Sequence, residues 1–227
     1  MTTMSVKRGV LIAFEGIDGT GKSTQIELLA ARLRELGLAV VVTREPTDGP
    51  HGRRIREMFL QRASLSPAEE LRLFVEDRRE HVAQLIAPAL AAGKVVLTDR
   101  YYFSTVAYQG AAGHDPAVLL ALNESFAPRP DLVLLLEAPP AVGVRRVREL
   151  RGESLNDFEQ EEYLRRVAEI FAGFNDSRMR RIDAIGDIEG VRRQVWPPVR
   201  ELLVQKGLLA IGRPDPVQAN ADDHDQV

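Results

Sequence analysis

The sequence contains no cysteine, and aromatic residues make up only 6% of its 227 residues. Without cysteine, the chain can form neither disulfides nor thiolate metal sites. Its net charge of −3 lacks the basic excess typical of proteins that bind DNA or RNA, so we expect no nucleic-acid partner. The longest apolar runs, such as "LVLLLEAPPAV", are too short to cross a bilayer, so we expect no membrane partner. The start of the chain has no apolar core of signal-peptide length, which predicts a cytoplasmic protein.

The sequence does contain a regular alternation of apolar, β-branched runs with helical patterns. Strands are predicted at 10–14, 39–43, 94–98, 131–137 and 180–184. Helices are predicted at 22–36, 52–62, 67–92, 115–126, 140–150, 157–175 and 187–205. The first four strands are apolar on both faces, as in parallel strands covered by helices on both sides. The pattern predicts an α/β fold with a doubly wound, five-stranded parallel sheet and helices on both faces.

The end of the chain differs in composition from the rest. After Gly207 the segment "RPDPVQANADDHDQV" is polar, acidic and contains proline, which is typical of a disordered tail. We therefore expect one domain over residues 1–206 and a disordered acidic tail over 207–227.

The segment "GIDGTGKS" (16–23) fits the phosphate-binding pattern G-x-x-x-x-G-K-[ST] between a predicted strand and a predicted helix. Backbone N–H groups must point inward around a polyphosphate there, which requires conformations that side chains obstruct. Lys22 would reach the β- and γ-phosphates, and the Ser23 hydroxyl would bind Mg²⁺. The motif predicts a P-loop that binds a nucleoside triphosphate through Gly16, Gly19, Thr20, Gly21, Lys22, Ser23 and Thr24.

Polar residues also follow the third predicted strand. Asp99 and Arg100 would face the same crevice as the P-loop, because ligands in such folds bind at the carboxyl ends of the strands. Asp99 could accept a hydrogen bond from a Mg²⁺-bound water, and Arg100 could clamp a phosphate. An ion pair that ties strand to helix explains the two residues equally well.

The predicted helix 67–92 carries an arginine within its apolar stripe. Leu71, Phe74, Val82 and Leu85 recur at three- and four-residue spacing, and Arg78 occupies a step where an apolar residue belongs. Phe74 and Arg78 share a face because they are four residues apart. Together they could bind a planar base. The spacing alone favours core packing for Phe74 and a snorkelling or ion-paired Arg78.

Arginines crowd the end of the predicted helix 140–150, at Arg145, Arg146, Arg148 and Arg151, and an acidic helix follows. Such a run is usually a solvated charged face. The alternative is a mobile lid over about 145–160 that carries arginines over the transferring phosphoryl group.

Several motifs together resemble the thymidylate kinases, which belong to the nucleoside monophosphate kinases. The resemblance covers most of residues 8–205, in the right order. It rests on "FEGIDGTGKST", "TREP", "LF…DR…H", "DRYYFSTVAYQG", "RPDLVLLLEAPPAVGVRR" and "IDA…IEGV". It implies a P-loop NTPase fold with a short lid, ATP and a deoxynucleoside monophosphate as substrates, Mg²⁺ as cofactor, and a homodimer.

The resemblance also implies roles in binding the acceptor base and sugar. Phe74 would stack on thymine, and Arg78 would hydrogen-bond the base. Ser104 and Thr105 would lie near the base edge, with Gln109 in the same substrate-binding segment. Tyr108 would pack against the sugar, and Asp18 would meet its 3′-hydroxyl.

For the phosphates, the resemblance implies that Arg100 and Arg44 hold the acceptor phosphate, while Ala184 borders the donor adenine. Because the loop from Ile17 to Thr20 contains no arginine, the lid would supply the catalytic arginine as Arg148 or Arg151. The implied catalytic residues are Lys22, Arg100, Arg148 and Arg151, and the implied metal-site residues are Ser23 and Asp99.

These observations predict transfer of the γ-phosphoryl group of ATP to dTMP, giving dTDP for dTTP synthesis. A phosphate monoester loses its second proton near pH ~6, so the acceptor oxygen needs no general base. Two departures keep other acceptors open: "TDGPHGRR" (47–54) replaces the common Gly-Gly-Thr run, and Glu137 replaces the usual aspartate.

The alternative enzyme is a kinase of another deoxynucleotide or of a deoxynucleoside. A deoxynucleoside kinase would need Glu45 or Asp99 as a general base. A non-catalytic nucleotide-binding switch is a further alternative, but the chain lacks the guanine-reading N-K-x-D motif.

Overall fold

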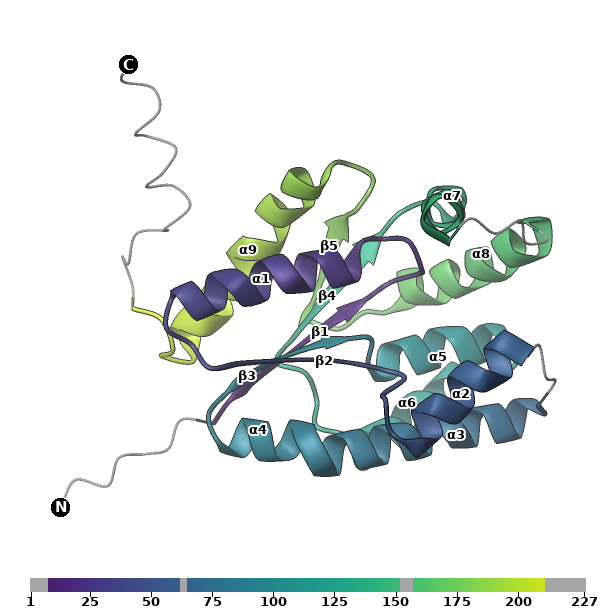
Figure 1. The fold of residues 1–227 in the computed structure, drawn as a ribbon, viewed down its shortest axis with the longest axis horizontal. Coiled ribbons are helices and arrows are strands. Elements are labelled where there is room, and N and C mark those ends of the chain that lie inside the picture. The colour runs from purple at the N-terminus through teal and green to yellow at the C-terminus, as the bar shows by residue number, and fades with distance from the viewer. Residues whose placement is uncertain (1–7, 62–64, 152–156, 211–227) are drawn as a thin grey trace.

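Five parallel strands form the centre of the protein in the computed structural model, which describes residues 8–61, 65–151 and 157–210 (Figure 1). The strands are β1 (Val10–Glu15), β2 (Val40–Arg44), β3 (Val95–Asp99), β4 (Leu132–Glu137) and β5 (Met179–Asp183). Their order across the sheet is β2-β3-β1-β4-β5, and every neighbouring pair is parallel. The predicted fold class and all five predicted strands are confirmed.

Side chains of the central strand alternate between the two faces of the sheet. Val10, Ile12 and Phe14 of β1 lie in a hydrophobic cluster with α1 (Lys22–Glu35) and α9 (Ile188–Gln205). Leu11 and Ala13 lie in a second cluster on the opposite face. Because both faces are covered, β1 is completely buried, as its apolar run from Val10 to Phe14 predicts.

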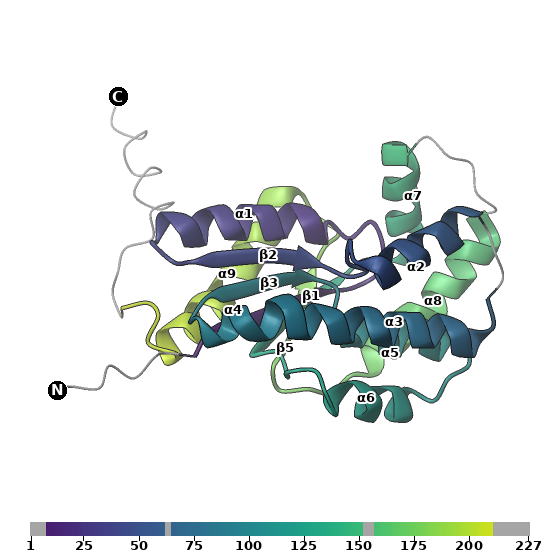
Figure 2. The same cartoon turned by 60° about the horizontal axis from the view of Figure 1, so that its bottom comes forward.

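The second face is covered by helices from several parts of the chain (Figure 2). One long helical segment contains α3 (Pro67–His81), the π-helical turn η1 (Val82–Ile86) and α4 (Ala87–Ala91). The other helices are α2 (Pro50–Gln61), α5 (Tyr102–Ala111), α6 (Pro116–Glu124), α7 (Pro140–Arg151) and α8 (Asp157–Gly173). The predicted helix 67–92 is therefore present, with a π-helical turn inside it.

Helix α5 was not predicted from the sequence. Six consecutive residues of this helix, Tyr102 to Ala107, are buried, so the segment has no polar face that would reveal a helical period. Its aromatic and β-branched residues are also common in strands. Burial by the surrounding helices overrides this local preference.

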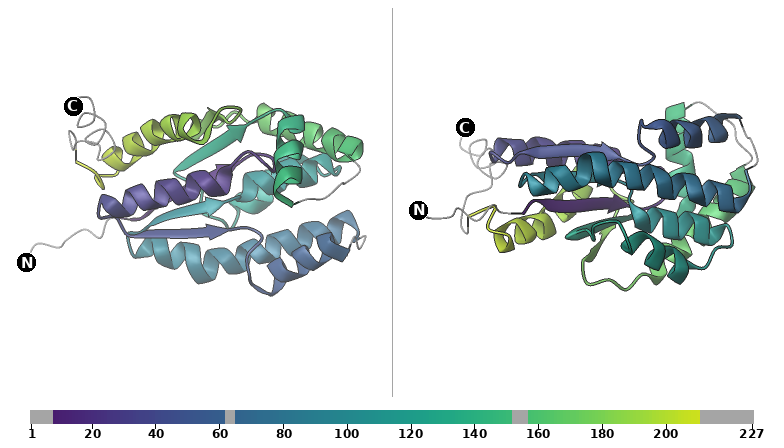
Figure 3. Two further views of the ribbon diagram at one scale, coloured as in Figure 1. Left: turned by 45° about the horizontal axis from the view of Figure 1, so that its top comes forward. Right: turned by 90° about the horizontal axis from the view of Figure 1, so that it is seen from below.

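The parallel arrangement directs the carboxyl ends of the strands to one edge of the sheet. There β1 leads into the P-loop, β2 leads toward α2, and β3 leads into α5. Helix α7 stands at this same end of the molecule (Figure 3). No helix among the described residues is long and apolar enough to span a membrane. The predicted lid at 145–160 and tail at 207–227 lie partly outside the described residues, which omit 152–156 and 211–227.

Candidate active site

The P-loop follows β1 and depends on glycine for its shape. Gly16 and Gly19 have φ angles of +130° and +80°, in the region that favours glycine. A Cβ on Gly16 would lie 2.3 Å from the carbonyl oxygen of Leu136, and one on Gly19 would lie 2.3 Å from that of Gly143. Helix α1 begins directly after the loop without a side-chain cap, so its first N–H groups are available to an anion.

Lys22 is bent back over the loop. Its Nζ donates to the carbonyl oxygens of Gly16 and Ile17, at 3.0 and 2.9 Å, and its side chain is buried. Burial lowers the pKa of Lys22 to about 8, and the positive charge of Arg100 acts in the same direction. A bound anion would oppose both effects, so this lysine is well placed to bind a polyphosphate.

Ser23 and Asp99 meet beside the loop, although 76 positions separate them in the sequence. The Ser23 hydroxyl donates to Oδ2 of Asp99 at 2.6 Å. Parallel pairing of β1 with β3 brings Phe14 opposite Asp99, which places this carboxylate at the mouth of the P-loop. A hydroxyl and a carboxylate are oxygen ligands that fit Mg²⁺, which usually retains waters and substrate phosphates as its other ligands.

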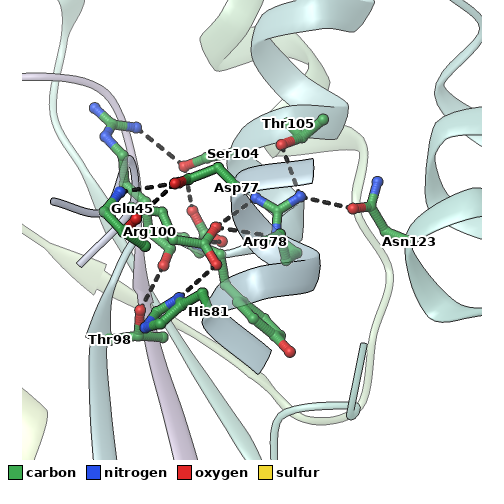
Figure 4. Close-up of polar contacts among 12 residues, drawn as sticks. Glu45, Asp77, Arg78, His81, Thr98, Arg100, Ser104, Thr105 and Asn123 are labelled. Atoms are coloured by element: carbon green, nitrogen blue, oxygen red, sulfur yellow. Dashed lines mark hydrogen bonds and ion pairs between the residues drawn. The ribbon is translucent and has the colours of Figure 1, made fainter. Parts of the chain in front are cut away.

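Arg100 lies at the centre of a polar cluster around the P-loop. Its Nη2 donates to Oδ1 of Asp18 at 2.8 Å and to the hydroxyl of Tyr108 at 3.2 Å. Its Nη1 donates to Oγ of Ser104 at 3.0 Å, a contact drawn in Figure 4. The fold therefore brings together four residues predicted for substrate binding: Asp18, Arg100, Ser104 and Tyr108.

Arg78 is only 1% exposed and donates hydrogen bonds to the loop after β2, to α5 and to α6 (Figure 4). Its Nε and Nη2 donate to Oε2 of Glu45, at 2.9 and 2.5 Å. Its Nη1 donates to Oγ1 of Thr105 at 3.0 Å and to Oδ1 of Asn123 at 2.6 Å. Four of its five N–H groups are thus occupied. The sequence left open whether Arg78 binds a base or forms an ion pair, and the structure contains the ion pair with Glu45.

The partner of Arg78 is itself part of a buried chain of polar groups. Oε1 of Glu45 lies 2.9 Å from Nδ1 of His81, whose Nε2 lies 2.7 Å from Oγ1 of Thr43. Burial alone would raise the pKa of Glu45, but Arg78 and His81 hold it below its ordinary value. Glu45 is therefore a charged partner inside the protein. This role disfavours Glu45 as the general base of a deoxynucleoside kinase.

The environment of Phe74 differs from that of a core residue. Its ring is half-buried and belongs to neither hydrophobic cluster of the described residues. The neighbouring Leu73 and Val75 are buried instead. Of the predicted apolar stripe, Val82 lies in the second hydrophobic cluster and Leu85 packs against it, whereas Leu71 and Phe74 are only half-buried. Core packing therefore covers the Phe74 ring only in part.

Gln109 is buried near the C-terminal end of α5. Its Nε2 donates to Oε1 of Glu70 at 3.0 Å, while its own Oε1 has no hydrogen-bond partner among the described residues. Buried polar atoms are nearly always hydrogen-bonded in native proteins. The amide oxygen of Gln109 is therefore a buried acceptor that the described residues leave unsatisfied.

The segment that departs from the family pattern is anchored to α3. Thr47 donates through its backbone N and its hydroxyl to the buried carboxylate of Asp77, at 2.9 and 2.6 Å. The exposed side chain of Arg44 pairs with Asp48 at 3.0 Å, and Arg56 pairs with the same carboxylate at 2.9 Å. Arg44 is thus held by its neighbour in the loop, and sequence reasoning did not single out Arg56.

On the donor side, Arg146 bridges the P-loop and the turn after β5. Its guanidinium donates to the carbonyl oxygens of Ala184 and Ile185, at 2.8 and 3.0 Å, and to that of Gly19 at 3.4 Å. Arg148 is exposed on α7. The side chain of Arg151 lies outside the described residues, as do all side chains from 150 to 160.

A cavity of about 590 Å³ opens on the β4–β5 side of the P-loop. Its walls include Gly16, Ile17, Glu137, Phe171 and Arg181, and the guanidinium of Arg181 pairs with the carboxylate of Glu137. Phe74, Arg78 and Arg100 do not line it. This cavity is therefore separate from the residues predicted to bind the acceptor.

Sequence reasoning missed Asn123 as a partner of Arg78, and it missed Glu15, which is buried at the end of β1. Nothing in the local pattern marks Asn123, which is 45 positions from Arg78. For Glu15 there was a signal: a carboxylate that ends an otherwise apolar strand directly before the P-loop.

Comparisons with known proteins agree with this geometry. The family model described as thymidylate kinase matches residues 14–195. A thymidylate kinase from Desulfotalea psychrophila is 51% identical over 200 residues, covering 88% of this chain and 98% of the relative. Those from Xanthomonas campestris pv. campestris and Xylella fastidiosa are 48% and 46% identical, covering 91% and 86% of this chain and 89% and 88% of the relatives. This chain therefore belongs to the thymidylate kinase family.

Proposed function

We propose that this chain is a kinase that transfers the γ-phosphoryl group of ATP to dTMP, giving dTDP for dTTP synthesis. The observation that carries the proposal is the hydrogen bond of Arg100 to Asp18 at 2.8 Å. This hydrogen bond joins the P-loop to the polar cluster after β3. Arg100 would therefore lie between the triphosphate of ATP and the phosphate of dTMP. Family membership supports the same reaction.

Thymine would bind between Phe74 and the buried polar residues of α3 and α5. The half-buried ring of Phe74 supplies a face for stacking. The Oε1 of Gln109, which has no partner in the part of the chain that the structure describes, is an acceptor that suits the N3–H of thymine. Arg78 keeps one N–H of Nη2 without an acceptor among the described residues, and this donor suits a carbonyl oxygen of the base.

Several contacts of the acceptor cluster suit a deoxyribose phosphate. Asp18 would accept from the 3′-hydroxyl, and the ring of Tyr108 would lie against the sugar. Arg100 would hold the phosphate, because its guanidinium is partly exposed beside Asp18 and the P-loop. Arg44 would join it after leaving Asp48, an exposed pair that costs little to separate.

The P-loop would hold the triphosphate of ATP through its backbone N–H groups and through Lys22. Ser23 and Asp99 would hold Mg²⁺, directly or through water, and the metal would neutralise charge on the β- and γ-phosphates. Ala184 and the side chain of Arg146 would border the adenine. Arg148 or Arg151 would bring positive charge to the transferring group when the lid closes.

Phosphoryl transfer to dTMP needs no protein base, because the acceptor phosphate is already an anion at neutral pH. The residues then have two tasks, to align the two phosphates and to neutralise their charge. The ion-paired state of Glu45 fits this mechanism. The protein would work in the cytoplasm, and it would form a homodimer as its family implies.

The experiment is ADP release from ATP and Mg²⁺ with dTMP, dUMP, the ribonucleotide of thymine, or thymidine as acceptor. We expect the highest kcat/KM for dTMP and background release with thymidine. Rapid turnover of thymidine would assign a nucleoside kinase. ATP binding without ADP release on any acceptor would assign a nucleotide-binding switch. The Lys22→Ala variant serves as the background control.

A further inference from the structure

Glu15 is a fully buried carboxyl group that the proposed chemistry does not use. It is the last residue of β1 and has no exposed surface. Burying a carboxyl group is costly unless hydrogen bonds compensate for the lost water. Glu15 has two such bonds: Oε1 accepts from the backbone N–H of Tyr101 at 3.0 Å, and Oε2 accepts from the hydroxyl of Ser104 at 2.5 Å. Both donors belong to the segment that follows Arg100.

The backbone of Arg100 is held in an unfavourable conformation. Its φ angle is +70°, and it is the only non-glycine residue with a positive φ in the described part of the chain. For such a residue this region is energetically unfavourable, and it persists only where the surroundings impose it. The N–H of Arg100 donates to the carbonyl of Phe14 at 2.9 Å, and its carbonyl accepts from the hydroxyl of Thr98 at 2.8 Å. The bond from Tyr101 to Glu15 fixes the next peptide group.

The side chain of Arg100 is held by the same carboxyl group through one intermediate. The hydroxyl of Ser104 has a single proton, and it donates this proton to Glu15. Its lone pairs are therefore left to accept from Nη1 of Arg100, at 3.0 Å (Figure 4). Glu15 thus orients the hydroxyl, and the hydroxyl orients the guanidinium.

We propose that Glu15 is a positioning residue for Arg100, acting through Ser104 and the backbone of Tyr101, and that Ser104 serves the phosphate clamp. The inference rests on the proposed function, in which Arg100 holds the phosphate of a nucleoside monophosphate. It changes the role expected for Ser104, whose hydroxyl is committed to Glu15 and Arg100, away from the base edge. Glu15 itself touches neither substrate.

The charge balance around Glu15 agrees with this role. Burial raises the pKa of Glu15 to about 7, while the hydrogen bond from Ser104 and the positive charge of Arg100 act against that rise. A carboxyl group so far from water is retained at a cost. The hydrogen bonds of Glu15 with Tyr101 and Ser104 offset part of this cost and hold the segment that follows Arg100.

The test compares the binding of dTMP with that of thymidine by calorimetry, because the two ligands differ only in the phosphate that Arg100 would hold. The variants are Glu15→Gln, which keeps the size but adds a donor facing Ser104, Ser104→Ala, and the double variant. Leu132→Ala is the stability control, since Leu132 is buried at the start of β4, away from the carboxyl ends of the strands. Kinetics with dTMP and ATP provide a second readout.

Each single variant should lose about tenfold in affinity for dTMP, comparable to one charge-assisted hydrogen bond, with thymidine binding unchanged. The KM for dTMP should rise by a similar factor and the KM for ATP should change less than twofold. The double variant should be no worse than either single variant, since both break one chain of contacts. Leu132→Ala should change none of these ratios.

An unchanged ratio of dTMP to thymidine affinity in Glu15→Gln would overturn the inference, as would additive effects of the two substitutions. Wild-type protein that binds dTMP no better than thymidine would overturn it as well, because Arg100 would then hold no phosphate. The proposed function fails differently: dTMP would bind through its phosphate but no ADP would form.

Discussion

Removal of Arg78 should affect stability as strongly as substrate binding, because this arginine neutralises a buried carboxylate. The Arg78→Ala variant leaves Glu45, which is 6% exposed, with His81 as its remaining side-chain partner. It also removes the donors to Thr105 and Asn123. Breaking a buried ion pair by removing one partner costs about 3–5 kcal/mol. For a domain of this size that corresponds to a fall in Tm of about 6–20 °C.

The pH dependence of this loss identifies its cause. In the intact protein the pKa of Glu45 lies below its ordinary value of 4.5. Its pairing therefore stabilises the fold above about pH 4.5, and the contribution is lost as the pH falls through the folded pKa. Without Arg78, burial raises the pKa of Glu45, and the stranded carboxylate destabilises the fold only while it is ionised. The deficit should therefore be larger at about pH 8 than at about pH 5.

Urea unfolding, followed by the fluorescence of the single tryptophan, Trp196, measures both quantities. The matched control is the double variant Arg78→Met with Glu45→Leu, which removes both charges and fills similar volume. It should be more stable than Arg78→Ala, because no carboxylate is left without its partner. The KM for dTMP should stay high in both variants. A loss below about 1 kcal/mol with no pH trend would refute the reasoning, since Glu45 would then not depend on Arg78.

Three other variants test the side of the site that would bind ATP. Lys22→Ala should abolish ADP release, and near-normal turnover would exclude the P-loop from the mechanism. Gly19→Ala should weaken ATP binding at least about tenfold, because its Cβ would lie 2.3 Å from the Gly143 carbonyl; unchanged affinity by calorimetry would contradict the loop geometry. Removing Arg148 and Arg151 together should lower kcat by about 10³, with both KM values nearly constant. If urea unfolding changed and kcat did not, these arginines would have only a structural role.

Much of the fold follows from local pattern. Strand β1 is apolar on both faces because helices cover both, and the glycines after it match the turn that a phosphate requires. Helix α5 escaped prediction for the opposite reason. Its residues from Tyr102 to Ala107 are all buried, so neither a polar face nor a helical period is visible. In a helix that is buried on all sides, apolar and polar residues do not alternate with a helical period, so the sequence does not indicate a helix.

The candidate site was only partly predictable for a similar physical reason. The pairing of Ser23 with Asp99 could be expected, because parallel strands present their carboxyl ends at one edge. The contacts of Arg78 with Asn123 and with Glu45 could not, because they join residues 45 and 33 positions apart. A hydrogen bond depends on distance and angle in space, which spacing along the chain does not encode.

The sequence by itself determined the order of the five strands and of the helices other than α5, the P-loop and the likeness to the thymidylate kinases. These features depend on neighbouring residues, whose relation is set by covalent geometry and side-chain pattern. Only the tertiary structure decided that Arg78 is ion-paired, that Phe74 lies outside the core, and that Glu15 reaches the Arg100 segment through Ser104. These facts depend on which groups lose water together when the sheet and helices pack. The cost of burying charge is then balanced by partners that are distant in the sequence.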